Sequence, residues 1–178
     1  MILTLSSATA FAQVSLKPHL NENTKVRTTI EVSTKQTLTL AGMPLETGVE
    51  QFIVTNGQIG EKQADGKVQM LGKMETFQID MKLPGGIEVN FDSGNPKTEA
   101  AIPQLTPILQ MFDAMSSSTY VTTFSAPGKI DSIVLKGDKF DALADAMKQE
   151  LSPERLKLEA AQALARIPTD PVVKGDTW

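Results

Sequence analysis

Cysteine is absent from all 178 residues of the sequence. This absence excludes disulfide bonds, thiolate metal sites, a cysteine nucleophile and lipid attachment through an N-terminal cysteine. Histidine is almost as rare: His19 is the only one, and no serine or aspartate pattern beside it predicts a catalytic triad. We therefore predict that His19 is a surface residue.

Long apolar runs and an excess of positive charge are also lacking. No stretch of about eighteen consecutive apolar residues is present, so no transmembrane segment is predicted. The formal net charge is −4, and the few aromatic residues are not interleaved with lysine or arginine. Because a phosphate backbone requires a basic surface, a nucleic-acid partner is not expected.

Several motifs that carry chemistry are missing as well. The glycines at 57, 60, 85 and 86 form no phosphate-binding GxGxxG or GxxxxGK pattern, and no GxSxG elbow surrounds the serines at 116–118. One group of carboxylates lacks the ligand spacing and the glycine of a calcium loop, and we expect its members to be solvated or helix-terminal charges: Asp131, Asp138, Asp141 and Asp145. We predict no catalytic residue, no metal ligand and no cofactor, and the ligand-binding residues are left unassigned.

The clearest positive signal is an alternation of apolar and polar residues from Lys25 to Leu40. Its apolar side carries Val26, Ile30, Val32 and Leu38, interrupted by threonines and a glutamine, and its other side is polar throughout. A period of two predicts a strand with one packed face and one solvated face. At sixteen residues the strand is unusually long, which favours a long, curved antiparallel sheet.

Further strands and turns follow this strand. We predict strands over 45–55, 67–83 and 87–91, with hairpin turns at Asn56-Gly57 and Asp65-Gly66, which together form a meander of about five strands. Apolar residues at three- and four-residue steps then predict a helix over 102–115, regular from about Thr106. A second hairpin over 120–136 precedes a helix carrying the apolar residues of 140–151 and another that starts at Ser152-Pro153-Glu154, with Ser152 as its cap.

These elements predict an α+β fold: a long curved antiparallel sheet, half-barrel-like, with about three amphipathic helices packed on one face. Residues 1–12 are interpreted as the remnant of a secretory signal peptide, because Ala10-Phe11-Ala12 has the small-x-small form that a signal peptidase cleaves. Residues 13–178 are interpreted as a single domain that is truncated at the C-terminus. The expected location is periplasmic or extracellular.

Methionines are spread over the predicted strands and helices, at positions 43, 70, 74, 81, 111, 115 and 147. Methionine is adaptable and polarisable, so a methionine-rich apolar surface can accept lipid-like ligands of variable shape. The alternative is that these side chains simply fill the core.

A set of short motifs resembles an uncharacterised family of exported bacterial proteins. The motifs are the threonine-rich strand ending near Gly42, the Asp92-Ser93 pair, the turn at 126–130, the helix start at 152–154 and the segment PVVKGDTW at 171–178. Members of that family continue beyond this last segment, and the resemblance implies no activity. The order of elements is also similar to that of periplasmic lipoprotein-carrier half-barrels, in which a curved sheet wraps helices and holds acyl chains.

Two functions are compatible with this interpretation. The first is a non-enzymatic cell-envelope protein that binds an apolar ligand, a lipid or a lipidated partner, between sheet and helices. The second is a structural or protein-interaction module of the envelope that has a dry core and pairs through an exposed sheet edge. A hydrolase is not expected, because no nucleophile, base and orienting group can be named.

Overall fold

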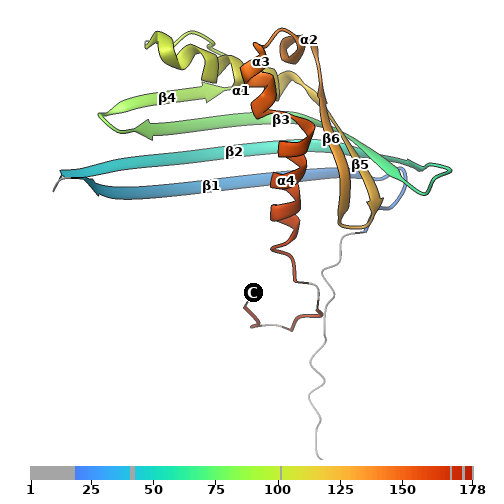
Figure 1. The fold of residues 1–178 in the computed structure, drawn as a ribbon. Coiled ribbons are helices and arrows are strands. Elements are labelled where there is room, and N and C mark those ends of the chain that lie inside the picture. Colours follow the sequence, from blue (N-terminus) through green and yellow to red (C-terminus); the bar gives the residue numbers. More distant parts are fainter. Residues whose placement is uncertain (1–18, 41–42, 101, 169, 174, 178) are drawn as a thin grey trace, which may run out of the picture.

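A computed structural model describes residues 19–40, 43–100, 102–168, 170–173 and 175–177. The predicted signal remnant over 1–12 therefore lies outside the described residues. The fold is α+β, with one open antiparallel sheet and helices beside it, which confirms the predicted class (Figure 1).

The sheet contains six strands. They are β1 (Lys25–Leu40), β2 (Met43–Lys62), β3 (Val68–Leu83), β4 (Ile87–Asp92), β5 (Thr119–Ala126) and β6 (Lys129–Lys136). Their order is β1-β2-β3-β5-β6, and β4 also pairs with β3. All pairs are antiparallel, as expected for strands joined by short turns.

Strand β3 changes its neighbour halfway along its length. Its first part, 68–73, pairs with β5, and its last part, 78–83, pairs with β4. Between these parts a bulge leaves Glu75 without a partner on β2. Because a bulge bends a strand and increases its twist, it allows β5 and β6 to run steeply across the direction of β1 to β3 (Figure 1).

The bulge explains why the predicted turn at Asn56-Gly57 is wrong. Both residues lie inside β2, where the Asn56 side-chain amide donates to the Glu75 carboxylate at 2.8 Å. A Cβ atom at Gly57 would lie 3.1 Å from the sulfur of Met70, so this glycine serves close packing and not a turn. The predicted turn at Asp65-Gly66 is confirmed, with Gly66 at a φ of 84°.

The helices are the 3₁₀ turn η1 (Pro103–Leu105), α1 (Thr106–Ser117), α2 (Asp138–Asp141), α3 (Asp145–Glu150) and α4 (Pro153–Leu164). The start of α1 at Thr106 is as predicted. The helix expected over 140–151 is instead two short helices, because the chain is extended at Ala144 before Asp145 opens α3. Ser152 stands at the start of α4 as predicted, but its side chain makes no capping hydrogen bond; its carbonyl accepts from the Leu156 amide at 3.0 Å.

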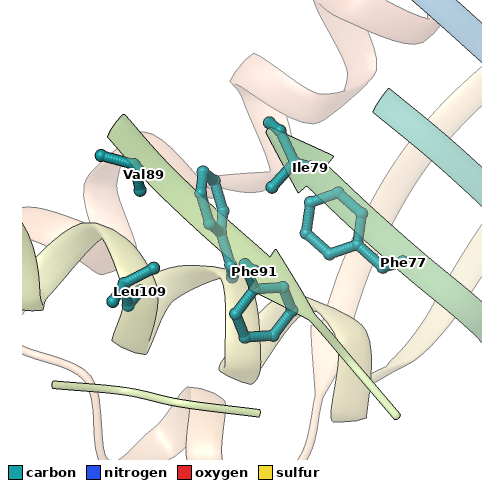
Figure 2. Close-up of a cluster of buried hydrophobic side chains, with 6 residues drawn as sticks. Phe77, Ile79, Val89, Phe91 and Leu109 are labelled. Carbon is teal, nitrogen blue, oxygen red and sulfur yellow. The ribbon is translucent and has the colours of Figure 1, made fainter. Parts of the chain in front are cut away.

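Two clusters contain most of the buried apolar side chains of the described residues, and Val54, Ile59, Val68 and Ile133 are buried outside them. The first cluster contains Phe77, Ile79, Val89, Phe91, Leu109 and Phe112, and brings β3, β4 and α1 together (Figure 2). The second cluster contains Ala114, Leu135, Leu143 and Leu151, and joins α1, β6 and the chain around α2 and α3. The helices therefore cover the β3, β4 and β6 parts of the sheet.

The Asp92-Ser93 pair at the end of β4 has a structural role. The Ser93 hydroxyl accepts a hydrogen bond from the Phe77 amide at 2.9 Å, and the Ser93 amide donates to the Phe77 carbonyl at 2.9 Å. Asp92 caps the following turn by accepting from the Gly94 amide at 2.8 Å. The pair thus fixes the end of β4 against the residue at the centre of the first cluster.

Replacing Ser93 by alanine is expected to lower the free energy of unfolding by about 1–2 kcal/mol, because the Phe77 amide loses its acceptor. Urea denaturation followed by circular dichroism measures the change. Replacing Ser117 by alanine is the matched control: its hydroxyl is exposed and bonds only to carbonyls of its own helix. Equal effects of the two substitutions would contradict the assigned role of Ser93.

Candidate functional site

The candidate site is the uncovered part of the apolar sheet face, which we call the open face. It consists of alternate residues of β1 and the β2 residues opposite them: Val26, Thr28, Ile30, Val32, Thr34, Gln36, Leu38, Leu45, Thr47, Val49, Gln51, Ile53 and Thr55. The pairing of β1 with β2 continues without a register shift, so these side chains stay on one side of the sheet over the full length of β1.

Burial on this side of the sheet falls from β3 to β1. Ile30, Ile53 and Phe77 stand opposite one another on three neighbouring strands. Phe77 is 1% exposed, Ile53 is half-buried against the first cluster, and Ile30 is 42% exposed. The covering helix α1 packs on β3 and β4, so its protection ends at β2.

The predicted packed face of β1 is therefore wrong. Every residue from Lys25 to Thr39 is exposed, on both faces of the strand. Val32 is 40% exposed and Leu38 is 61% exposed. The alternation correctly identifies the apolar side of β1, but no described helix lies close enough to cover it. Figure 1 shows that the C-terminal end of β1 and the N-terminal end of β2, which lie side by side, extend beyond the helices.

The space between α1 and the sheet is already filled. The rings of Phe77, Phe91 and Phe112 contact one another with centroid separations of 5.5–5.8 Å. Figure 2 shows Phe77 and Ile79 on one strand, Val89 and Phe91 on the next, and Leu109 on the helix, all directed into a common interior. An apolar ligand would therefore have to lie on the open face, beside this cluster and not beneath α1.

One hollow adjoins the open face. It has a volume of about 640 Å³, is open to solvent and lies at the adjoining ends of β1 and β2 and the β3–β4 turn. Residues from both sides of the sheet line it, among them Gln36, Leu45, Thr47, Leu83, Lys35, Glu46, Lys82 and Glu88. Gln36, Leu45, Thr47 and Leu83 share the apolar side of the sheet, whereas the charged lining residues come from the other side. The hollow joins apolar surface to charged groups at one end of the open face.

Five of the described methionine side chains pack around the two clusters, and Met70 lies beside Gly57 of β2. Met74 and Met81 lie against the first cluster, Met115 and Met147 lie against the second, and Met111 contacts both. This packing agrees with the alternative in which the methionine side chains fill the core. Met81 stands opposite Val49 on the border of the open face, and Met70 lies beside Gly57, which stands opposite Val26.

Residues considered for chemistry are explained by structure. The hydroxyls of Ser116, Ser117 and Ser118 all donate to carbonyl groups of α1, which leaves them as a helix terminus. His19 is exposed, as predicted. Asp138, Asp141 and Asp145 are exposed in the first turns of short helices, as expected for solvated charges.

Asp131 forms an ion pair with Lys67 at 3.7 Å, which links β6 to the start of β3. Among the described residues no group of three or more histidine, aspartate or glutamate side chains is placed to hold a metal ion. None of the described helices combines the length and the apolar character that crossing a membrane requires.

Comparison with known proteins gives no match to any family model, curated protein or solved structure.

Proposed function

We propose that this chain is a non-enzymatic binding protein of the bacterial cell envelope that holds an apolar ligand, a lipid or the acyl chain of a lipidated partner. The observation that carries the proposal is the open face. Ile30, Val32 and Leu38 expose apolar side chains on one side of β1, and Ile30 stands opposite Ile53, which packs against the cluster that α1 covers. A row of exposed apolar side chains on one side of a strand, here interrupted by Thr34 and Gln36, favours an interaction site over an ordinary solvated face.

The chemistry of the open face suits an acyl chain. Aliphatic side chains supply nonspecific apolar contact, whereas Thr28, Thr34 and Gln36 supply polar groups for the more polar end of a ligand. The location in the envelope rests on the predicted signal remnant over 1–12. The resemblance to exported bacterial proteins and the half-barrel outline support the same proposal.

Native mass spectrometry of the protein, isolated gently from the envelope fraction, tests for the ligand. The expected result is an additional mass that disappears on denaturation and has the composition of a lipid. A bare mass from folded protein would contradict the proposal.

Replacing Ile30 or Val32 by aspartate is expected to reduce ligand retention by about tenfold or more, because a charge would be placed in apolar contact. Both side chains are exposed, so the variants are expected to fold. Retention is measured as the fraction of protein carrying the added mass.

Thr29→Asp is the matched control, since it places the same carboxylate on the same strand but on the opposite face. Unchanged retention in folded Ile30→Asp and Val32→Asp variants would refute the assignment of the open face.

A second candidate function is a protein-interaction module that pairs with another polypeptide through β1. The observation that favours it is the position of β1 at the end of the strand order. An edge strand presents N–H and C=O groups to which another strand can add.

A further inference from the structure

The outer edge of β1 lacks three of the usual protections against pairing, although it carries charged side chains. Within the part of the chain that the structure describes, no strand pairs with this edge. Edge strands are commonly short, bulged or interrupted by proline. By contrast, β1 is 16 residues long, contains no proline and pairs with β2 without a bulge, although β2–β3 and β5–β6 both contain register shifts.

The polar face of β1 carries charges in a self-complementary order. Arg27 is already engaged by Glu75 at 3.1 Å, which leaves Glu31 and Lys35 as the central charges. Neither Glu31 nor Lys35 forms an ion pair with any other described residue. They stand two positions on either side of Ser33.

We infer that the partner of this edge is a second copy of the chain, paired antiparallel about a two-fold axis at Ser33. In this register Glu31 of each copy stands opposite Lys35 of the other, so that two cross-strand ion pairs form. A two-fold axis at a residue also keeps the side chains of both copies on matching faces. The inference rests on the second candidate function and is independent of the proposed apolar ligand.

Neighbouring registers lack this complementarity. A centre at Val32 places Glu31 opposite Ser33, and a centre at Thr34 places Lys35 opposite Ser33, so neither forms an ion pair. A centre at Glu31 places that carboxylate opposite itself and Arg27 opposite Lys35. Like charges directly opposite one another destabilise an antiparallel pair, whereas opposite charges stabilise it.

The same register joins the two open faces. Val32 of one copy stands opposite Thr34 of the other, and Ile30 stands opposite Gln36, so the apolar rows of both copies continue across the axis on one side of the sheet. Side chains of the partner's β1 would also lie next to those of this β1 and would cover part of their exposed surface, although both faces of the strand would remain open. Pairing would also remove the unpaired backbone groups of the edge.

Sedimentation velocity of the full chain and its variants tests the inference. Wild-type protein is expected to form dimers. Lys35→Glu and Glu31→Lys are each expected to weaken dimerisation by about tenfold or more, because two attractive pairs become two repulsive ones. Lys25→Glu is the matched control: it makes the same charge change on the same strand, outside the paired charges, and should leave dimerisation unchanged.

Mixing the Lys35→Glu and Glu31→Lys variants is the decisive experiment. The Lys35→Glu copy carries two carboxylates and the Glu31→Lys copy carries two ammonium groups, so a heterodimer should form although neither variant dimerises well alone. The double variant Glu31→Lys/Lys35→Glu should dimerise with itself. Circular dichroism of each variant checks that the fold is retained.

Cysteine crosslinking tests the register itself, and the cysteine-free chain makes the result unambiguous. Ser33→Cys places the two thiols opposite one another on the axis, so oxidation should give a disulfide-linked dimer. Thr37→Cys places the two thiols several residues apart, beyond the reach of a disulfide. This variant should therefore migrate as a monomer on a denaturing, non-reducing gel.

Three outcomes would overturn the inference. They are a wild-type protein that stays monomeric, a dimer that is insensitive to both charge reversals, and crosslinking of Thr37→Cys in preference to Ser33→Cys. If the protein is monomeric and its β1 edge binds a different polypeptide, the second copy is refuted as the partner, although β1 still pairs through its edge. All these substitutions leave Ile30 and Val32 unchanged, so lipid retention by native mass spectrometry can be measured separately on the same variants.

Discussion

Replacing Phe77 by alanine is expected to lower the free energy of unfolding by about 3–5 kcal/mol. Phe77 is 1% exposed and contacts Phe91 and Phe112, with an edge-to-face arrangement toward Phe112 at a centroid separation of 5.5 Å. Removal of the ring leaves a cavity between β3, β4 and α1 that the surrounding backbone cannot close. Urea denaturation followed by circular dichroism measures the loss.

Two alanine variants in the same cross-strand row supply the controls. Ile53 and Ile30 lie in the same cross-strand row as Phe77, on β2 and β1, so the three positions share one face, and the two isoleucines differ from each other in burial alone. Ile53→Ala is expected to cost less than Phe77→Ala, and Ile30→Ala is expected to cost less than about 1 kcal/mol. A cost for Ile30→Ala as large as that for Phe77→Ala would show that β1 is packed and would remove the basis for the open face.

Local patterns in the sequence were sufficient to predict most of the elements. The alternation over Lys25–Leu40 predicted β1 with its observed bounds, because side-chain direction in a strand depends only on the period of two. The turn glycines at 66, 85, 86 and 128 have positive φ values, the property that makes glycine a turn signal. The helix start at Thr106 followed from the position of the neighbouring prolines.

Features set by contacts between distant segments were not predictable. Asn56-Gly57 has the composition of a hairpin turn, but Asn56 bonds to Glu75 and Gly57 lies against Met70. The change of neighbour along β3 likewise depends on a bulge at Glu75 that no local pattern indicates. In each case the local preference is outweighed by pairing with a strand far away in the sequence.

The candidate site was only half predictable for the same reason. The alternation places Ile30 and Val32 on the apolar side of β1, and this assignment agrees with their register opposite Ile53 and Gln51. Whether a helix covers that side depends on where α1 packs, and α1 packs on β3 and β4 through Leu109 and Phe112. The pattern therefore identifies an apolar face, whereas its exposure is a property of the whole fold.

Alkaline pH is expected to destabilise the protein through Tyr120, the only tyrosine in the sequence. Its ring packs against the second cluster and its hydroxyl donates to the Met115 carbonyl at 3.1 Å. Burial raises the pKa of Tyr120 well above its ordinary value, because the charged phenolate would lose its hydration. The folded state therefore retains the phenolic proton at a pH at which the unfolded chain has lost it.

The sign of the pH dependence follows from this difference. The stabilisation by neutral Tyr120 is complete below the tyrosine pKa of the unfolded chain, about 10, and is lost as the pH rises above it, by about 1.4 kcal/mol per pH unit. Urea denaturation of wild type and Tyr120→Phe between about pH 9 and about pH 11 isolates this contribution, since other groups titrate equally in both proteins. The free energy of unfolding of wild type should fall more steeply than that of Tyr120→Phe. Phenolate absorbance that rises near the ordinary tyrosine pKa, while circular dichroism still reports a folded chain, would contradict the burial of this hydroxyl.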